Sequence, residues 1–317
     1  MPLLLFLVGL FLVGKGADFL VAGAAALAKR LKISDLVIGL TIVSFGTSAP
    51  ELSVNLFAAA GGNTAIAAGN VIGSNIFNIL VILGTCALIR PLTVQSTTIF
   101  KELPFSLLAA LAMGFAASDM LFDHASAAVI SRTDSALLLL FFAIFMYYAF
   151  NMARSGEEMV EDATPVYSLP MSLLRMVGGL TLLLLGGKWM VDSAVTIAAF
   201  LGMSEAVIGL TVVAMGTSIP ELATSVAAIR RKNSEIAIGN VVGSNIFNIF
   251  LILGVTGVIH PLPIAAESQV DLLVLIAITL VLFLLIYNHR QRQLVRVHGI
   301  LFLSLYAIYL GYLLLFR

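Results

Sequence analysis

The sequence predicts an all-α polytopic membrane protein with ten transmembrane helices, arranged as two inverted five-helix repeats. Three observations lead to this fold class: apolar segments recur along the whole chain, one long segment is duplicated, and basic residues gather on alternate connections. Of the 317 residues, 60% are hydrophobic and only 11% are charged, and the mean hydropathy is +1.08. A soluble domain carries about 25% charged residues. The composition therefore indicates a chain that folds in a lipid bilayer.

Ten apolar segments lie between polar breaks, and most of them are close to or longer than the roughly 20 residues that a helix needs to cross a bilayer. Several are long enough to require tilting or a broken middle. The first has an apolar start like a signal peptide but no basic residue ahead of it, so we interpret it as a retained helix. The predicted spans are roughly 3–28, 35–60, 65–89, 103–118, 135–152, 171–199, 205–229, 235–258, 270–288 and 297–316.

Lys and Arg residues predict the orientation of these spans. If the spans alternate, only Arg132 and Arg317 lie on one side, Lys15 and Lys188 lie within spans, and all other basic residues share the opposite side. By the positive-inside rule, both termini then face outward and the polar mid-chain segment is cytoplasmic. We expect a bacterial cytoplasmic (inner) membrane protein. A local pair between Lys188 and Asp192, one helical turn apart, is expected within its span.

The two halves of the chain match each other. Residues 39–84 align without a gap to residues 209–254, with 27 identities in 46 positions. Five spans per half is an odd number, so the second copy enters the membrane from the opposite side, as in many secondary transporters. We therefore expect a first repeat at 1–152 with its motif at 39–84, a short cytoplasmic linker at 153–170, and a second repeat at 171–317 with its motif at 209–254.

The segment GTSAPEL, residues 46–52, returns as GTSIPEL, residues 216–222, and both copies lie within predicted spans. Pro50 and Pro220 cannot donate to the carbonyls of Gly46 and Gly216, which predicts free backbone oxygens. A glutamate within a span is rare and usually functional, and here it occurs twice. The candidate ligands in these segments are Glu51 and Glu221, with the hydroxyls of Thr47, Ser48, Thr217 and Ser218.

The segment GNVIGSNIFN, residues 69–78, returns as GNVVGSNIFN, residues 239–248. Its glycines, four residues apart, suit close packing of membrane helices. Packing needs only the glycines, whereas the polar positions, also four apart, lie on one helix face and add further candidate ligands. These are Ser74 with Asn78, and Ser244 with Asn248, while Asn70, Asn75, Asn240 and Asn245 are expected to be structural hydrogen bonders.

Carboxylates, hydroxyls and amides from both repeats would form an oxygen cage. Ca²⁺ prefers about six to eight oxygen ligands, and Na⁺ suits the same kind of cage. His and Cys, which favour zinc and copper, are missing near both motifs. The zero net charge of the chain gives no indication of a nucleic-acid partner.

At these motifs the chain resembles the cation/calcium antiporter superfamily, and specifically its bacterial sodium/calcium exchanger (calcium/sodium antiporter) branch. The resemblance covers essentially the whole chain and implies exchange of several Na⁺ for one Ca²⁺ by alternating access. It implies that Glu51 and Glu221 are shared ion ligands, helped by the residues named above and by the carbonyls of Ser44 and Ala214. Asn248 departs from the aspartate that many relatives carry, which makes a required K⁺ ion less expected.

We expect a transporter that exports Ca²⁺, with Ca²⁺ and Na⁺ as its substrates, no cofactor, no catalytic residue and no obligate protein partner. A proton/calcium antiporter is the nearest alternative, because protons also neutralise carboxylates. A passive cation channel would need a continuous pore, which inverted repeats with a midplane site disfavour. An intramembrane hydrolase using Ser48 or Ser74 would need an activating base, and the sequence places none beside either serine.

Overall fold

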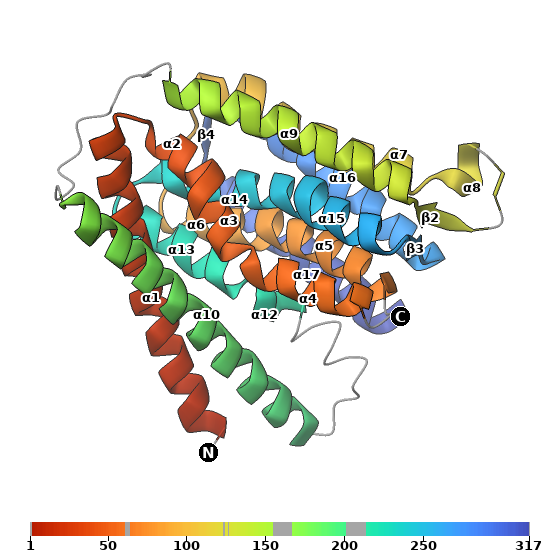
Figure 1. Cartoon of the computed structure of the whole chain (residues 1–317), viewed down its shortest axis with the longest axis horizontal. Coiled ribbons are helices and arrows are strands. Elements are labelled where there is room, and N and C mark those ends of the chain that lie inside the picture. Colours follow the sequence, from red (N-terminus) through yellow and green to blue (C-terminus); the bar gives the residue numbers. More distant parts are fainter. Residues whose placement is uncertain are drawn as a thin grey trace.

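The computed structural model describes residues 2–60, 64–122, 124–125, 127–154, 167–200 and 214–316 (Figure 1). Within them, eight helices are long and apolar enough to cross a membrane, and one bent helix pair makes a possible ninth. The nearly all-helical membrane fold predicted from the sequence is confirmed. The first part of the predicted span at 205–229 lies outside the described residues, which resume at residue 214. Most of the predicted linker at 153–170 also lies outside them, since residues 155–166 are not described.

The first half forms five spans, of which the second and third consist of several consecutive segments. The second span bends by 44° between Asp35–Thr47 and Ala49–Ala60. The elements are α1 (Pro2–Leu31), α2 (Asp35–Ile38), η1 (Gly39–Val43), α3 (Ser44–Thr47), α4 (Ala49–Ala60), α5 (Thr64–Phe77), η2 (Asn78–Leu83), α6 (Gly84–Ile89), β1 (Leu92–Thr93), η3 (Thr98–Glu102), α7 (Leu103–Ala116), α8 (Asp119–Phe122), β2 (Ala128–Ile130) and α9 (Arg132–Arg154), the η segments being π-helical.

The second half follows a similar order, offset by 170 residues in the duplicated motifs, but α16 replaces η3 and α7 and no described helix corresponds to α8. Its described elements are α10 (Leu169–Phe200), α12 (Ala214–Thr217), α13 (Ile219–Arg230), α14 (Ser234–Ile246), η5 (Phe247–Leu253), α15 (Gly254–Ile259), β3 (Leu262–Ile264), α16 (Ala266–Asn288), β4 (Gln293–Leu294) and α17 (Arg296–Phe316).

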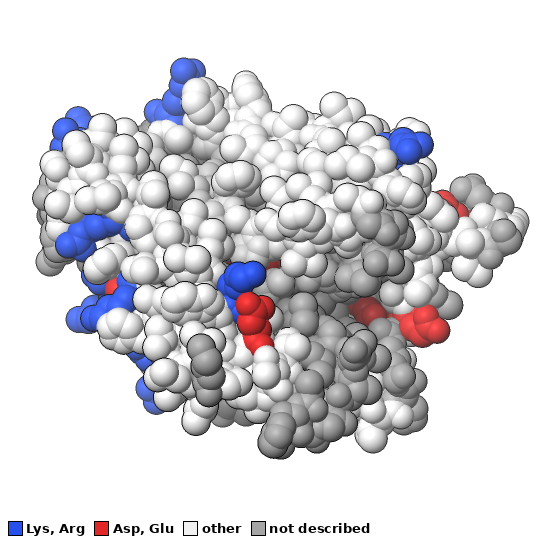
Figure 2. Space-filling view, turned by 60° about the horizontal axis from the view of Figure 1, so that its bottom comes forward, with Lys and Arg blue, Asp and Glu red and all other residues white. Residues whose placement is uncertain are grey.

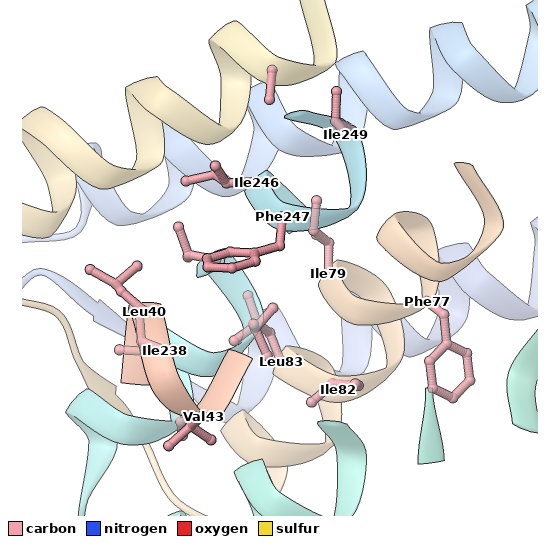
Figure 3. Close-up of a cluster of buried hydrophobic side chains, with 14 of the residues drawn as sticks. Leu40, Val43, Phe77, Ile79, Ile82, Leu83, Ile238, Ile246, Phe247 and Ile249 are labelled. Atoms are coloured by element: carbon pink, nitrogen blue, oxygen red, sulfur yellow. The ribbon is translucent and has the colours of Figure 1, made fainter. Parts of the chain in front are cut away.

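The core lies where the third spans of the two halves meet the broken second span. These two spans, Ala67–Ile89 and Ser234–Ile259, are the most buried of the candidate spans. Figure 3 shows Leu40 of η1 beside Ile238 of α14, the helix against which η1 packs. In lipid there is no water to drive helices together, so such close packing of side chains has to supply the cohesion.

Four short strands depart from a purely helical prediction and link the two halves. β1 follows the third span of the first half and pairs with β4, between the fourth and fifth spans of the second half. β2 and β3 form the reciprocal antiparallel pair. Where a helix ends, extended backbone must still find hydrogen-bond partners, and a strand from the other half supplies them. The halves therefore interlock at both ends.

Helices α1 and α10 run side by side along one edge of the molecule (Figure 1). Their contact is lined by glycines seven residues apart. A Cβ atom added to Gly16 would lie 2.7 Å from the Gly179 oxygen, and one added to Gly9 would lie 2.7 Å from the Gly186 oxygen. Only glycine lets the two backbones approach this closely.

Charged residues are sparse and unevenly placed. In Figure 2, most visible Lys and Arg side chains lie toward the left of the view, where α9 ends and α10 begins in Figure 1. The expected Lys188–Asp192 pair is confirmed, with 4.0 Å between Nζ and Oδ2. Asp18, the counterpart of Lys188 in the first half, pairs with Arg231 at 3.6 Å.

Candidate cation-binding site

The two GTS-x-PE segments break their helices at equivalent serines. α3 ends at Thr47 and α4 begins at Ala49, and in the second half Ser218 separates α12 from α13. Pro50 and Pro220 each take the second position of the new helix, where a missing N–H costs nothing. Both glutamates thereby lie in the first turn of a helix, near its positive end, which favours a carboxylate. The release of the Gly46 and Gly216 carbonyls stays a prediction.

Each carboxylate is held by a serine from the opposite half. The Ser48 hydroxyl donates to Glu221 Oε1 at 2.9 Å, and the Ser218 hydroxyl donates to Glu51 Oε1 at 3.2 Å. Ser244 donates a longer bond of 3.4 Å to the same Glu221 oxygen. Both glutamate side chains are completely buried. The crossed bonds bring the two helix breaks together at one place between the halves.

The asparagines of the second motif are fixed in the same crossed manner. Asn78 Nδ2 donates to Asn245 Oδ1 at 3.0 Å, and Asn248 Nδ2 donates to Asn75 Oδ1 at 2.9 Å. Asn75 Nδ2 in turn donates to the Asn245 backbone oxygen. Asn75 and Asn245 are thus structural hydrogen bonders, as predicted. Because they bind the NH₂ groups of Asn78 and Asn248, the side-chain oxygens of those residues are left for another partner.

Five buried oxygens of the predicted ligands have no hydrogen-bond partner among the described residues. Buried polar atoms are nearly always paired, so such a group requires an explanation. All five lie on α4, α5, η2, α13 and η5, the segments joined by the crossed bonds, and all five are electron donors suited to a hard cation. They are Glu51 Oε2, Glu221 Oε2, Ser74 Oγ, Asn78 Oδ1 and Asn248 Oδ1.

The remaining predicted ligands have other contacts. The Thr47 hydroxyl donates to Asn240 Oδ1 at 3.0 Å, which ties α3 to α14. Thr217 lies near enough to the Glu51 carboxylate to interact with it. The Ser44 carbonyl accepts from the Ser48 amide at 2.9 Å. Its second lone pair is not claimed by the Thr47 hydroxyl, whose single proton goes to Asn240, so the ligand role that the resemblance implies for this carbonyl stays a prediction.

Sequence comparison of the two repeats missed Asn55. Its Nδ2 donates to the Glu51 backbone oxygen at 2.7 Å, and its buried Oδ1 has no partner among the residues that the structure describes. The counterpart position in the second half holds Ser225, so Asn55 is not part of the duplicated pattern that predicts the other candidate ligands. Its position one turn after Glu51 on the same helix face was the available signal. The π-helical segments next to the site were also unforeseen, although such segments are frequent at functional sites.

An inverted-repeat membrane fold with a buried oxygen cage between its halves defines a secondary cation transporter. The comparisons agree with this class. The model of the sodium/calcium exchanger protein family matches residues 1–151 and again 171–315. The chain therefore belongs to this family of cation/calcium antiporters, and it is a transporter rather than an enzyme.

Individual relatives match over nearly their whole length. The putative antiporter CaxA of Alkalimonas amylolytica is 39% identical, with 96% of this chain and 95% of that protein covered. The sodium/calcium exchanger MaX1 of Methanosarcina acetivorans is 30% identical, with 97% of each covered. A structure of the sodium-calcium exchanger NCX_Mj, soaked with Na⁺ and Sr²⁺, superimposes with a TM-score of 0.83 at 34% identity, covering 98% of this chain and 97% of that one.

Proposed function

We propose that this protein exchanges Na⁺ for Ca²⁺ across a bacterial cytoplasmic membrane and exports Ca²⁺ from the cell. The observation that carries the proposal is the group of five buried, unpartnered oxygens contributed by both halves. Two belong to carboxylates, so the group has the charge that neutralises one Ca²⁺ and the oxygen chemistry that Ca²⁺ and Na⁺ both accept. The family membership and the MaX1 and NCX_Mj relatives support the same ion pair.

The proposed ligand set consists of the ten predicted residues. Glu51 and Glu221 supply the charge, Ser74, Asn78 and Asn248 supply neutral oxygens, and Ser244 joins through its bond to Glu221. Thr47, Ser48, Thr217 and Ser218 hold the carboxylates and the adjoining helices in place.

Exchange follows from the cost of an uncompensated buried charge. Two carboxylates without a cation cannot be enclosed cheaply between the halves, because the low-dielectric interior does not solvate them. One Ca²⁺, several Na⁺ ions or protons would remove that cost. Only loaded forms would then pass readily between outward-open and inward-open states, so that each crossing in one direction requires a crossing in the other.

Alternating access would come from relative movement of the glycine-packed pair α1–α10 and the rest of the molecule. The divisions at 1–152, 153–170 and 171–317 stay a proposal, and so does an orientation with both termini outside. The gathering of basic residues at one end supports that orientation through the positive-inside rule.

The test is uptake of radioactive Ca²⁺ into proteoliposomes loaded with Na⁺, compared with vesicles that carry an outward proton gradient at the same voltage. Uptake driven by the Na⁺ gradient is expected. Uptake driven by protons alone would contradict the proposed coupling and favour the proton/calcium antiporter. Ca²⁺ flux without any coupled gradient would instead indicate a channel.

A further inference from the structure

A half-open groove of about 280 Å³ lies between α1 and α13, next to α10. A stripe of α1 from Leu10 to Asp18 forms one wall, and a stripe of α13 from Ile219 to Arg230 forms the other. Met190 of α10 also lines it. Apart from Asp18 and Arg230, every lining residue is apolar or glycine, so the groove offers water few hydrogen bonds and offers hydrocarbon a long apolar surface.

The two charged residues of the groove are in different situations. Asp18 is paired with Arg231 at 3.6 Å. Arg230 is exposed at the last position of α13, and within the described part of the chain no carboxylate lies within ion-pair distance of its guanidinium. Among the described residues, the groove therefore ends at a positive charge that has no carboxylate partner. Arginine binds phosphate well because its planar fork of N–H groups matches the phosphate oxygens.

We propose that this groove is a binding site for an anionic glycerophospholipid. One acyl chain lies along the apolar walls of α1 and α13, and the headgroup phosphate binds Arg230. Basic pockets between membrane helices commonly take anionic headgroups in this way. The lipid would fill the space between α1 and α13, the helix that carries Glu221, and so set their spacing. The proposal does not depend on which ions are exchanged.

Trp189 provides a direct probe, because it is the only tryptophan of the chain and precedes the groove residue Met190. Its fluorescence is measured in vesicles that contain phosphatidylglycerol or phosphatidylcholine with brominated acyl chains, which quench nearby tryptophan. We expect stronger quenching by the brominated phosphatidylglycerol at equal mole fraction. Arg230→Gln should abolish the several-fold preference. Arg290→Gln, which removes an exposed charge away from the groove, should retain it.

A second pair of variants tests the apolar part of the site. A Cβ added to Gly14 meets no atom within 4 Å, so Gly14→Leu should fold and fill the groove. Gly178 is equally open but does not line the groove, which makes Gly178→Leu a matched control. We expect a several-fold loss of phosphatidylglycerol quenching for Gly14→Leu alone. Equal quenching by both lipids in the unmodified protein, or an unchanged preference in both Arg230→Gln and Gly14→Leu, would overturn the proposal.

Discussion

At the scale of single residues, the two buried carboxylates determine what the site can bind. Glu51→Gln and Glu221→Gln keep the size of the side chain and remove one negative charge. At an effective dielectric constant near 20, two unit charges about 4 Å apart interact by roughly 4 kcal/mol, so losing one carboxylate charge next to a divalent ion costs more than about a thousandfold in affinity. We expect either variant to lose Ca²⁺ exchange while remaining folded and monodisperse. Ca²⁺ uptake in proteoliposomes, with size-exclusion chromatography as the folding control, measures this, and near-normal uptake would refute the role of the pair.

Asn248 makes a second test at this scale, because its NH₂ group donates to Asn75 Oδ1 at 2.9 Å. An aspartate at this position would place a carboxylate oxygen against an amide oxygen, and two acceptors repel. A bound proton or a rotated Asn75 amide would relieve the repulsion. We therefore expect Asn248→Asp to make Ca²⁺ exchange depend on pH or K⁺ more steeply than in the unmodified protein. Profiles that coincide for the two proteins would show that this position does not line the site.

The residues of the site differed in how far the sequence alone could identify them. Glu51 and Glu221 stood out because a duplicated charge within an apolar span has few structural explanations. The crossed hydrogen bonds of Ser48 and Ser218 could not be predicted from the sequence, because they depend on how the two halves face each other. Asn55 was missed because its function has no duplicate at Ser225. Comparison of the two repeats therefore identifies residues that have the same function in both halves, and it does not identify residues that act in one half alone.

At the scale of helices, the two halves hold their carboxylate helices differently. Asn240 on α14 donates to the Glu221 backbone oxygen at 3.2 Å and to Ser225 Oγ at 3.0 Å, and it accepts from Thr47. This one side chain joins α13, α14 and α3. Its counterpart Asn70 on α5 has a buried amide nitrogen with no partner in the described part of the chain, and Asn55 of α4 donates to the Glu51 backbone oxygen instead. α13 is thus tied to its neighbour, whereas the corresponding amide tie from α5 to α4 is not made.

This difference gives a matched pair of variants. Asn240→Ala leaves several buried groups without partners, at about 1–3 kcal/mol each, so we expect a clear loss of thermal stability and of exchange. Asn70→Ala removes an amide nitrogen that bonds no described residue, and it should cost about 1 kcal/mol or less. Thermal unfolding in detergent and Ca²⁺ uptake are measured for both. A cost for Asn70→Ala equal to that for Asn240→Ala would contradict the asymmetry.

The hydropathy of the sequence predicted the boundaries of the spans, but it did not predict the π-helical segments within them. The spans predicted at 65–89 and 235–258 are observed at Thr64–Ile89 and Ser234–Ile259. Hydropathy is averaged over a whole segment, so it predicts where a span lies but does not predict a π-helical segment within that span. η2 begins at Asn78 and η5 contains Asn248, so the unforeseen irregularities coincide with predicted ligands.

At the scale of the whole molecule, the fold divides into a tightly joined helix pair and an interlocked remainder. Glycines bring α1 and α10 into backbone contact, while the reciprocal strand pairs and the crossed asparagines fasten the other spans of the two halves together. The odd number of spans per repeat predicted the inversion. Interlocking could not be foreseen, because it depends on which half each fifth span packs against: α9 packs on α15 of the second half, and α17 packs on α6 of the first.

This division predicts which cross-links transport tolerates. Phe19 of α1 and Arg175 of α10 face each other, with 5.6 Å between the guanidinium carbon and the ring centroid. Cysteines in place of these two residues, in a chain whose Cys86 is replaced by alanine, should be joined by a short bifunctional thiol reagent that links α1 to α10. If the pair moves as one body, this link should leave Ca²⁺ exchange largely intact.

Cysteines in place of Asp18 and Arg231, joined by a short bifunctional thiol reagent, test the other contact. The side chains of these residues meet at 3.6 Å across α1 and the end of α13, so the link would bind the moving pair to the body that carries Glu221. We expect it to stop exchange, and cleavage of the reagent to restore it. Loss of exchange in the linked Phe19–Arg175 protein, with normal exchange in the Asp18–Arg231 protein, would place the moving boundary between α1 and α10 and refute the division.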